Sequence, residues 1–127
     1  MNKRIILTAA ILGLIAVIFG AFAAHKLKTL IDPAAIDIWN KGVQYHFYHT
    51  FALLYLSTFA RYKNNLINIS YFCFLGGIIL FSGSLYILAT KTITMIDFNQ
   101  LGFLTPVGGL LFILGWIMLF LAALKDK

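Results

Sequence analysis

Residues 5–24 of the chain read IILTAAILGLIAVIFGAFAA, and this stretch decides the fold. Its only polar side chain is that of Thr8, and two basic residues, Lys3 and Arg4, precede it. A helix of about 20 predominantly apolar residues spans the hydrocarbon core of a bilayer. The stretch therefore predicts a first transmembrane helix.

The same stretch has an alternative interpretation as a secretory signal peptide. Lys3 and Arg4 would be its basic start, and Ala21-Phe22-Ala23 would be a small-residue cleavage site. However, the apolar run exceeds the about 7–15 residues of a signal peptide's apolar core. We therefore favour a retained membrane span and keep cleavage as the alternative.

Three further apolar runs follow, at about residues 43–60, 66–90 and 103–124. In lipid, every backbone polar group needs a partner within its own segment, which favours helices. Strands are disfavoured because none of the runs alternates between apolar and polar residues. The sequence predicts an all-α bundle of four transmembrane helices forming a single domain over residues 1–127.

The first connection contains the signals for a short amphipathic helix. Asp32-Pro33 is typical of a helix start, with an acidic cap and a proline in the first turn. Ile36, Trp39 and Val43 then recur along one helical face. We expect an interfacial helix here that could continue into the second span, with Trp39 in an aromatic belt.

The composition excludes several functional classes. Hydrophobic residues make up 61% of the chain and charged residues 11%, against about 25% charged in soluble domains. Glutamate is absent, so the commonest groups for acid–base catalysis are scarce, and we predict no enzyme activity and no cofactor. The net charge of +6 comes from short clusters at the ends of apolar runs, which argues against nucleic-acid binding. Cys73 is the only cysteine and can form no internal disulfide.

The basic residues also predict an orientation. With four spans, the side of the termini would carry Lys3, Arg4, Arg61, Lys63, Lys125 and Lys127. The opposite side would carry Lys26, Lys28, Lys41 and Lys91. The excess of basic residues on the first side favours a bacterial plasma (inner) membrane protein with both termini in the cytoplasm.

Small residues recur at helical spacing in three of the predicted spans. Such stripes let helix backbones approach closely in lipid. They predict a compact bundle and also allow a homo-oligomer, with membrane lipids as the other expected partners. The stripes consist of Ala9, Gly13, Ala16, Gly20 and Ala24; of Gly76, Gly77, Gly83 and Ser84; and of Gly108, Gly115 and Ala122.

Three histidines, His25, His46 and His49, are the candidates for metal ligation or proton transfer. The predicted topology puts all three near the outer interface. A three-histidine metal site is therefore conceivable. Since no acidic residue within the spans supports it, we expect no metal site.

Other polar side chains are expected at the same outer level and could line a shallow pocket that opens outward. We predict the lining of such a ligand-binding pocket as His25, Trp39, Gln44, Tyr45, His49, Ser82, Ser84, Tyr86 and Thr105. No basic or acidic residue lies at the centre of a span, which disfavours ion transport.

Four segments of the chain carry a family resemblance. They are Gly20-Ala21-Phe22-Ala23-Ala24-His25; Trp39 with Val43-Gln44-Tyr45 and His49; Phe81-Ser82-Gly83-Ser84-Leu85-Tyr86; and Thr105-Pro106-Val107-Gly108-Gly109 with Gly115-Trp116. Together they resemble the YgdD/YwdK-like family of uncharacterised small membrane proteins. The resemblance covers all four spans and implies a four-helix integral membrane protein of unknown function, without catalytic residues to transfer.

One position departs from the family pattern, which often has Gln where this chain has His46. A three-histidine ligand set would then not be a family property, leaving His25 and His49 as the better pair. Two functional hypotheses follow. The first is a non-enzymatic membrane protein acting through lipids, a partner protein or self-association. The alternative is a protein that binds a lipid, quinone or metal in an outward-facing pocket.

Overall fold

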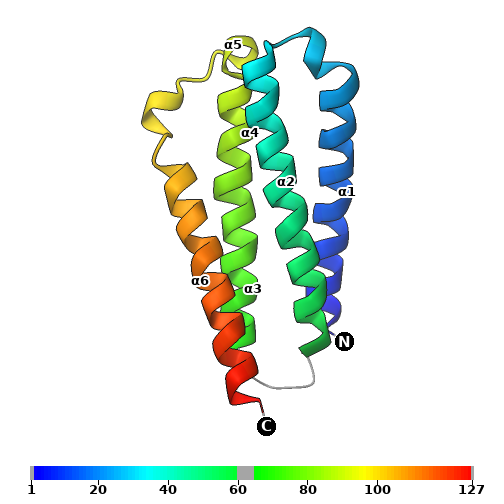
Figure 1. The fold of residues 1–127 in the computed structure, drawn as a ribbon, viewed down its shortest axis with the longest axis vertical. Coiled ribbons are helices and arrows are strands. Elements are labelled where there is room, and N and C mark those ends of the chain that lie inside the picture. Colours follow the sequence, from blue (N-terminus) through cyan, green and yellow to red (C-terminus); the bar gives the residue numbers. More distant parts are fainter. Residues whose placement is uncertain (1, 60–64, 127) are drawn as a thin grey trace.

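The computed structural model describes residues 2–59 and 65–126. Within these ranges the chain folds into four helical rods without strands (Figure 1). The first two rods are α1 (Lys3–His25) with the 3-10 turn η1 (Leu27–Thr29), and α2 (Pro33–Leu56) with η2 (Ser57–Phe59). The third consists of α3 (Asn65–Gly77), the π-helical segment η3 (Ile78–Ser82) and α4 (Gly83–Ala89). After α5 (Lys91–Thr94) and η4 (Phe98–Gln100), α6 (Leu104–Lys125) forms the fourth rod.

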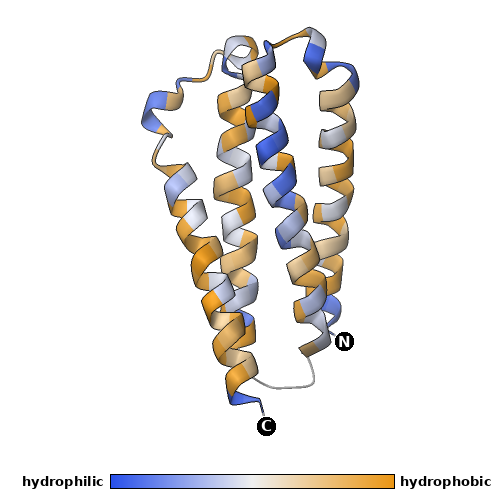
Figure 2. Cartoon of the chain, in the orientation of Figure 1, coloured by the Kyte–Doolittle hydropathy of each residue, from blue (hydrophilic) through white to orange (hydrophobic). Residues whose placement is uncertain are grey.

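The predicted all-α membrane bundle is confirmed. Three helical segments of the described chain are long and apolar enough to cross a membrane: Lys3–Thr29, Asn65–Ala89 and Leu104–Lys125. The fourth, α2, has 24 residues but carries polar side chains over much of its length, which Figure 2 shows in blue. The predicted end of the second span at residue 60, and the basic residues Arg61, Lys63 and Lys127, lie outside the described residues.

The helix expected in the first connection and the second span form one continuous helix, α2. Its start follows the predicted signal, because Asp32 Oδ1 accepts a hydrogen bond from the Ala35 amide over 2.8 Å and Pro33 occupies the first turn. No break separates this start from the apolar part. Gly42, inside the helix, makes room for the Tyr86 ring, which would lie 2.9 Å from a Cβ atom at that position.

The rods pack in the order α1, α2, third rod, α6. The first helix packs on α2, α2 packs on the third rod, and α6 packs on α3 and η3. Accordingly, α1 and α6 lie at opposite sides of the bundle in Figure 1. Both termini lie at one end, which we call the terminal end, and η1, α5 and η4 lie at the other, the loop end. Which end faces the cytoplasm stays a prediction.

The glycines of α6 bring it into direct contact with the third rod. A Cβ atom on Gly108 would lie 2.3 Å from the Phe81 backbone nitrogen, and one on Gly115 would lie 2.6 Å from the Phe74 ring. Ser70 adds a hydrogen bond to the Gly115 carbonyl over 2.8 Å. In α1, Ala9, Ala16 and Ala23 are buried in the bundle. These small residues therefore serve packing within the chain, and association of copies through such faces stays a prediction.

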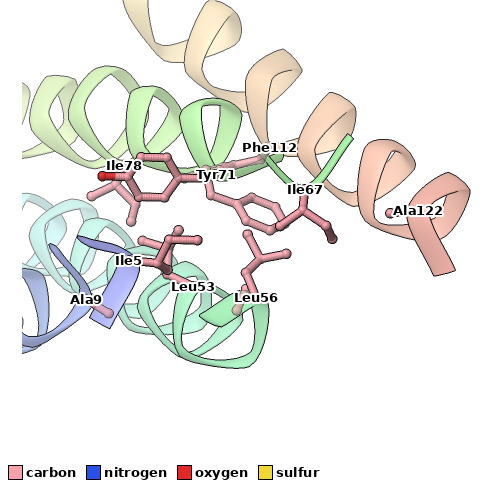
Figure 3. Close-up of a cluster of buried hydrophobic side chains, with 11 residues drawn as sticks. Ile5, Ala9, Leu53, Leu56, Ile67, Tyr71, Ile78, Phe112 and Ala122 are labelled. Carbon is pink, nitrogen blue, oxygen red and sulfur yellow. The ribbon is translucent and has the colours of Figure 1, made fainter. Parts of the chain in front are cut away.

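The main apolar core lies toward the terminal end. Figure 3 shows Ile5 of α1, Leu53 of α2 and Tyr71 of α3 among its buried side chains. The Tyr71 hydroxyl also bonds to the Thr8 hydroxyl over 2.8 Å, which links α3 to α1. A second cluster, around Trp39 and Val43, lies toward the loop end. The candidate site lies beside these two cores.

Candidate functional site

The three histidines lie at different depths, which corrects the expectation that all are near the outer interface. His25 is exposed at the end of α1, where its Nδ1 bonds to the Ala21 carbonyl over 2.8 Å. Because α2 begins at Pro33, His46 and His49 lie about 20 Å and about 24 Å along that helix from its start, at 1.5 Å per residue. Both side chains are also buried inside the bundle.

Among the residues that the structure describes, no three His, Cys, Asp or Glu side chains gather in a way that could hold a metal ion. The preferred pair, His25 and His49, is also separated. His25 lies at the loop end, where α1 ends, whereas His49 lies about 24 Å along α2 in the bundle interior. The continuous helix is the reason, because it carries His49 away from the loop end of the bundle instead of leaving it beside the first connection.

Three of the predicted pocket residues, together with His46, meet in a closed cluster between α1, α2 and the third rod. Trp39 donates its indole N–H to the Phe19 carbonyl over 3.0 Å, and its ring packs on Tyr86 with centroids 4.6 Å apart. The Tyr86 hydroxyl bonds to His46 Nδ1 over 2.9 Å. Ser82 donates to the Gly42 carbonyl over 2.7 Å. Because the polar groups of these residues bond to one another or to backbone carbonyls, and most of the side chains are buried, the cluster joins helices.

The other predicted polar residues form two separate pairs. Ser84 of α4 and Thr105 of α6 bond through their hydroxyls over 2.6 Å, which fastens α6 to the third rod. Gln44 donates to the Tyr48 hydroxyl on the exposed side of α2. The nine predicted lining residues therefore do not share one outward pocket.

His49 lies in a different environment, where α2 faces α6. Its side chain is 4% exposed and its ring stacks on Phe112, with centroids 3.6 Å apart and an interplanar angle of 7°. His49 Nδ1 bonds to the Tyr45 carbonyl over 2.8 Å, and Trp116 Nε1 donates to His49 Nε2 over 3.1 Å. A carbonyl only accepts and an indole N–H only donates. These partners assign the ring proton to Nδ1, so the imidazole is neutral.

Beside His49, a groove of about 1000 Å³ runs between α2 and α6. Both helices pack on the third rod, and mainly side chains cross the space between them. Six aromatic side chains dominate the lining, and aliphatic residues of α6 complete its edge. The lining consists of Tyr45, Tyr48, His49, Phe51, Phe81, Pro106, Gly109, Leu110, Phe112, Ile113 and Trp116. This aromatic groove, with one imidazole in its wall, is the candidate functional site.

Of the predicted pocket residues, only Tyr45 and His49 line this groove. Phe81, Phe112 and Trp116 were not predicted from the sequence, because aromatic residues within an apolar run look like ordinary lipid-facing positions. One feature of the sequence could have pointed to Trp116. Tryptophan in membrane helices is enriched at the interfaces, whereas Trp116 lies near the middle of α6.

The chain matches a known family and full-length relatives. The family model described as "Protein of unknown function (DUF423)" matches residues 19–109. The UPF0382 membrane protein YwdK of Bacillus subtilis is 40% identical over 125 residues, covering 97% of this chain and 98% of its own. A UPF0382 membrane protein of Haemophilus influenzae is 36% identical over 127 residues, covering 100% and 98%. No solved structure matches significantly.

These matches confirm the resemblance drawn from the four sequence segments, and the names of the relatives support a membrane location. The matched part contains Tyr45, His49 and Phe81 of the groove, and the relatives extend over Phe112 and Trp116. The chain belongs to the DUF423 family, whose relatives here are membrane proteins of unknown function.

Proposed function

We propose that this protein is a non-enzymatic binding protein for an apolar ligand, which it holds in the groove between α2 and α6. The observation that carries the proposal is the groove itself, with its about 1000 Å³ volume and its six aromatic side chains. Ligand sites are typically concave and mostly apolar, with a few polar groups that fix orientation. Here the His49–Trp116 pair supplies such groups.

The residues of the groove argue against catalysis. Its lining offers one imidazole and the hydroxyls of Tyr45 and Tyr48, without a carboxylate, an amine or a thiol. The His49 nitrogens are both engaged, one with the Tyr45 carbonyl and one with the Trp116 indole. Acid–base or nucleophilic catalysis needs a set of groups in mutual reach, so this lining suits binding.

The surroundings of the groove agree with a ligand drawn from the membrane. Side chains at its edge, such as Phe51, Leu110 and Ile113, are more than half exposed on the helix surfaces that would face lipid. A ligand dissolved in the bilayer could enter sideways. We place the protein in the bacterial plasma membrane with both termini in the cytoplasm, on the distribution of basic residues.

Tryptophan fluorescence can test ligand binding. In a Trp39→Phe background, Trp116 is the remaining tryptophan, and dibromododecane quenches it on contact. We expect saturable quenching, because the groove is a finite site. Adding Gly109→Leu, which fills the groove next to Phe81, should abolish the saturable part, whereas Gly83→Leu, where nothing lies within 4 Å, should leave it unchanged. Quenching that rises linearly and equally in all three proteins would disprove the proposal.

A further inference from the structure

We propose that the groove selects an apolar molecule whose only polar part is a hydroxyl group, and that this hydroxyl inserts between Trp116 Nε1 and His49 Nε2. The inference rests on the function proposed above and names the class of ligand. It follows from the depth of the polar pair, from its donor and acceptor pattern, and from the unequal anchoring of its two side chains.

Depth restricts the polar part of the ligand. Trp116 lies about 18 Å from the loop end of α6 and about 13 Å from its other end, at 1.5 Å per residue. This is the middle of a helix that is long and apolar enough to cross a membrane. Charged groups are costly at that depth, so a phospholipid headgroup would have to leave the interface to reach the pair. A small neutral group can reach it.

The hydrogen-bonding pattern restricts the group further. Trp116 Nε1–H can only donate. His49 Nε2 can only accept, because the ring proton on Nδ1 is held by the Tyr45 carbonyl. A group that separates them must therefore accept one hydrogen bond and donate another. A hydroxyl does both, whereas a carbonyl or ether oxygen would satisfy Trp116 and leave His49 Nε2 buried without a donor.

The side chains of His49 and Trp116 are anchored unequally, which indicates which of the two moves when a ligand enters. His49 is fixed by the Tyr45 carbonyl on one side of its ring and by the Phe112 stack on its face. Trp116 is 47% exposed, and its indole N–H bonds to His49 alone over 3.1 Å, while its ring packs edge-on against Phe74. Trp116 is therefore the residue that swings aside, and His49 is the fixed acceptor.

The groove also provides length for the apolar part of the ligand. From Trp116 the wall continues through Phe112 and Gly109 to Pro106, about 15 Å along α6. Phe81 and Tyr45 form the opposite wall and floor. A medium-length hydrocarbon chain, or a ring bearing such a chain, fits along this path with its hydroxyl at the Trp116 end.

The test compares matched hydroxyl and ether ligands as competitors of dibromododecane in the Trp39→Phe protein. Dodecanol against dodecyl methyl ether represents a chain alcohol, and octylphenol against octylanisole represents a phenolic ring. We expect at least one of the hydroxyl ligands to bind about tenfold more tightly than its ether, because the ether leaves His49 Nε2 unsatisfied. The pair with the larger ratio identifies the source of the hydroxyl.

A variant of His49 tests the selection of hydroxyl ligands separately from ligand binding itself. His49→Phe keeps a ring against Phe112 but removes the buried acceptor. It should bind alcohol and ether equally, a result that loss of packing alone would not produce. If this variant does not fold, the ratio of hydroxyl to ether affinity in the parent protein still tests the selection.

Equal binding of hydroxyl and ether ligands by the parent protein would overturn the selection while leaving the binding groove intact. If none of the four ligands competes and dibromododecane quenching is not saturable, the proposed function fails with it. The two failures are therefore distinguishable.

Discussion

Gly108 of α6 lies directly against the backbone of Phe81 in the π-helical segment η3, so closely that a Cβ atom would come within 2.3 Å of the Phe81 nitrogen. This contact brings α6 onto the third rod just where Phe81 turns its ring toward Tyr45 and Phe112, with centroids 4.8 Å and 5.5 Å away. The shape of the groove thus depends in part on Gly108. Single π-turns are often found at functional sites.

Replacement of Gly108 by Ala should destabilise the protein. The added methyl meets backbone atoms, which cannot rotate away, so α6 has to shift at a cost of about 1–3 kcal/mol. Gly83→Ala is the matched control, because its Cβ meets nothing and alanine favours helix. Thermal unfolding in detergent measures both. Similar melting temperatures for the two variants would contradict the close contact.

Removal of the Asp32 cap should weaken the start of α2. Asp32→Ala loses the hydrogen bond to the Ala35 amide, at a cost of about 1 kcal/mol, whereas Asp32→Ser keeps a capping oxygen. Hydrogen exchange at the amides of residues 34–36 should speed up in the alanine variant only. Unchanged exchange there would mean that α2 does not depend on this cap.

Tyr86 and His46 should be energetically coupled. Tyr86→Phe removes the hydroxyl that bonds to His46 Nδ1, and His46 Nε2 is already buried without a hydrogen bond. The single change should cost about 1 kcal/mol, because it strands a buried polar ring. In a double-mutant cycle, His46→Leu should therefore cost less stability in the Tyr86→Phe background than in the parent protein. Strictly additive melting shifts would show that the bond contributes nothing.

Orientation can be measured with single cysteines in a Cys73→Ser background. Thr29→Cys is at the loop end and Asp126→Cys at the terminal end, and both positions are exposed. We expect a membrane-impermeant maleimide to label the first in intact cells and the second only after permeabilisation, as the excess of basic residues near the termini predicts. The reverse pattern would invert the topology and move the groove's loop end to the cytoplasm.

Several features could be predicted because they depend on local sequence. The length and apolarity of residues 5–24, 66–90 and 103–124 require helices in lipid, and the structure has them with bounds shifted by a few residues. Asp32-Pro33 starts a helix through contacts within one turn, so this start was also predictable. The family resemblance was drawn from short sequence segments, and the matched family and relatives confirm it.

The site could not be predicted in the same way, because side chains from different helices build it. The sequence suggested one outward pocket, whereas His25, the Tyr86–His46 pair and His49 lie in three separate environments. The depths of His46 and His49 depend on α2 being continuous from Pro33. Sequence spacing gives the face of a helix, but the partner of that face depends on how the helices pack.

By itself, the sequence determined a membrane-embedded helical protein with a polar, aromatic second helix, because hydrophobic length and capping act within single segments. Only the tertiary structure decided that α2 and α6 face each other across a groove and that Trp116 donates to His49. The physical reason is close packing at glycines such as Gly108 and Gly115. It sets the angle and distance of α6 relative to the third rod, and with them the position of the α6 residues in the groove.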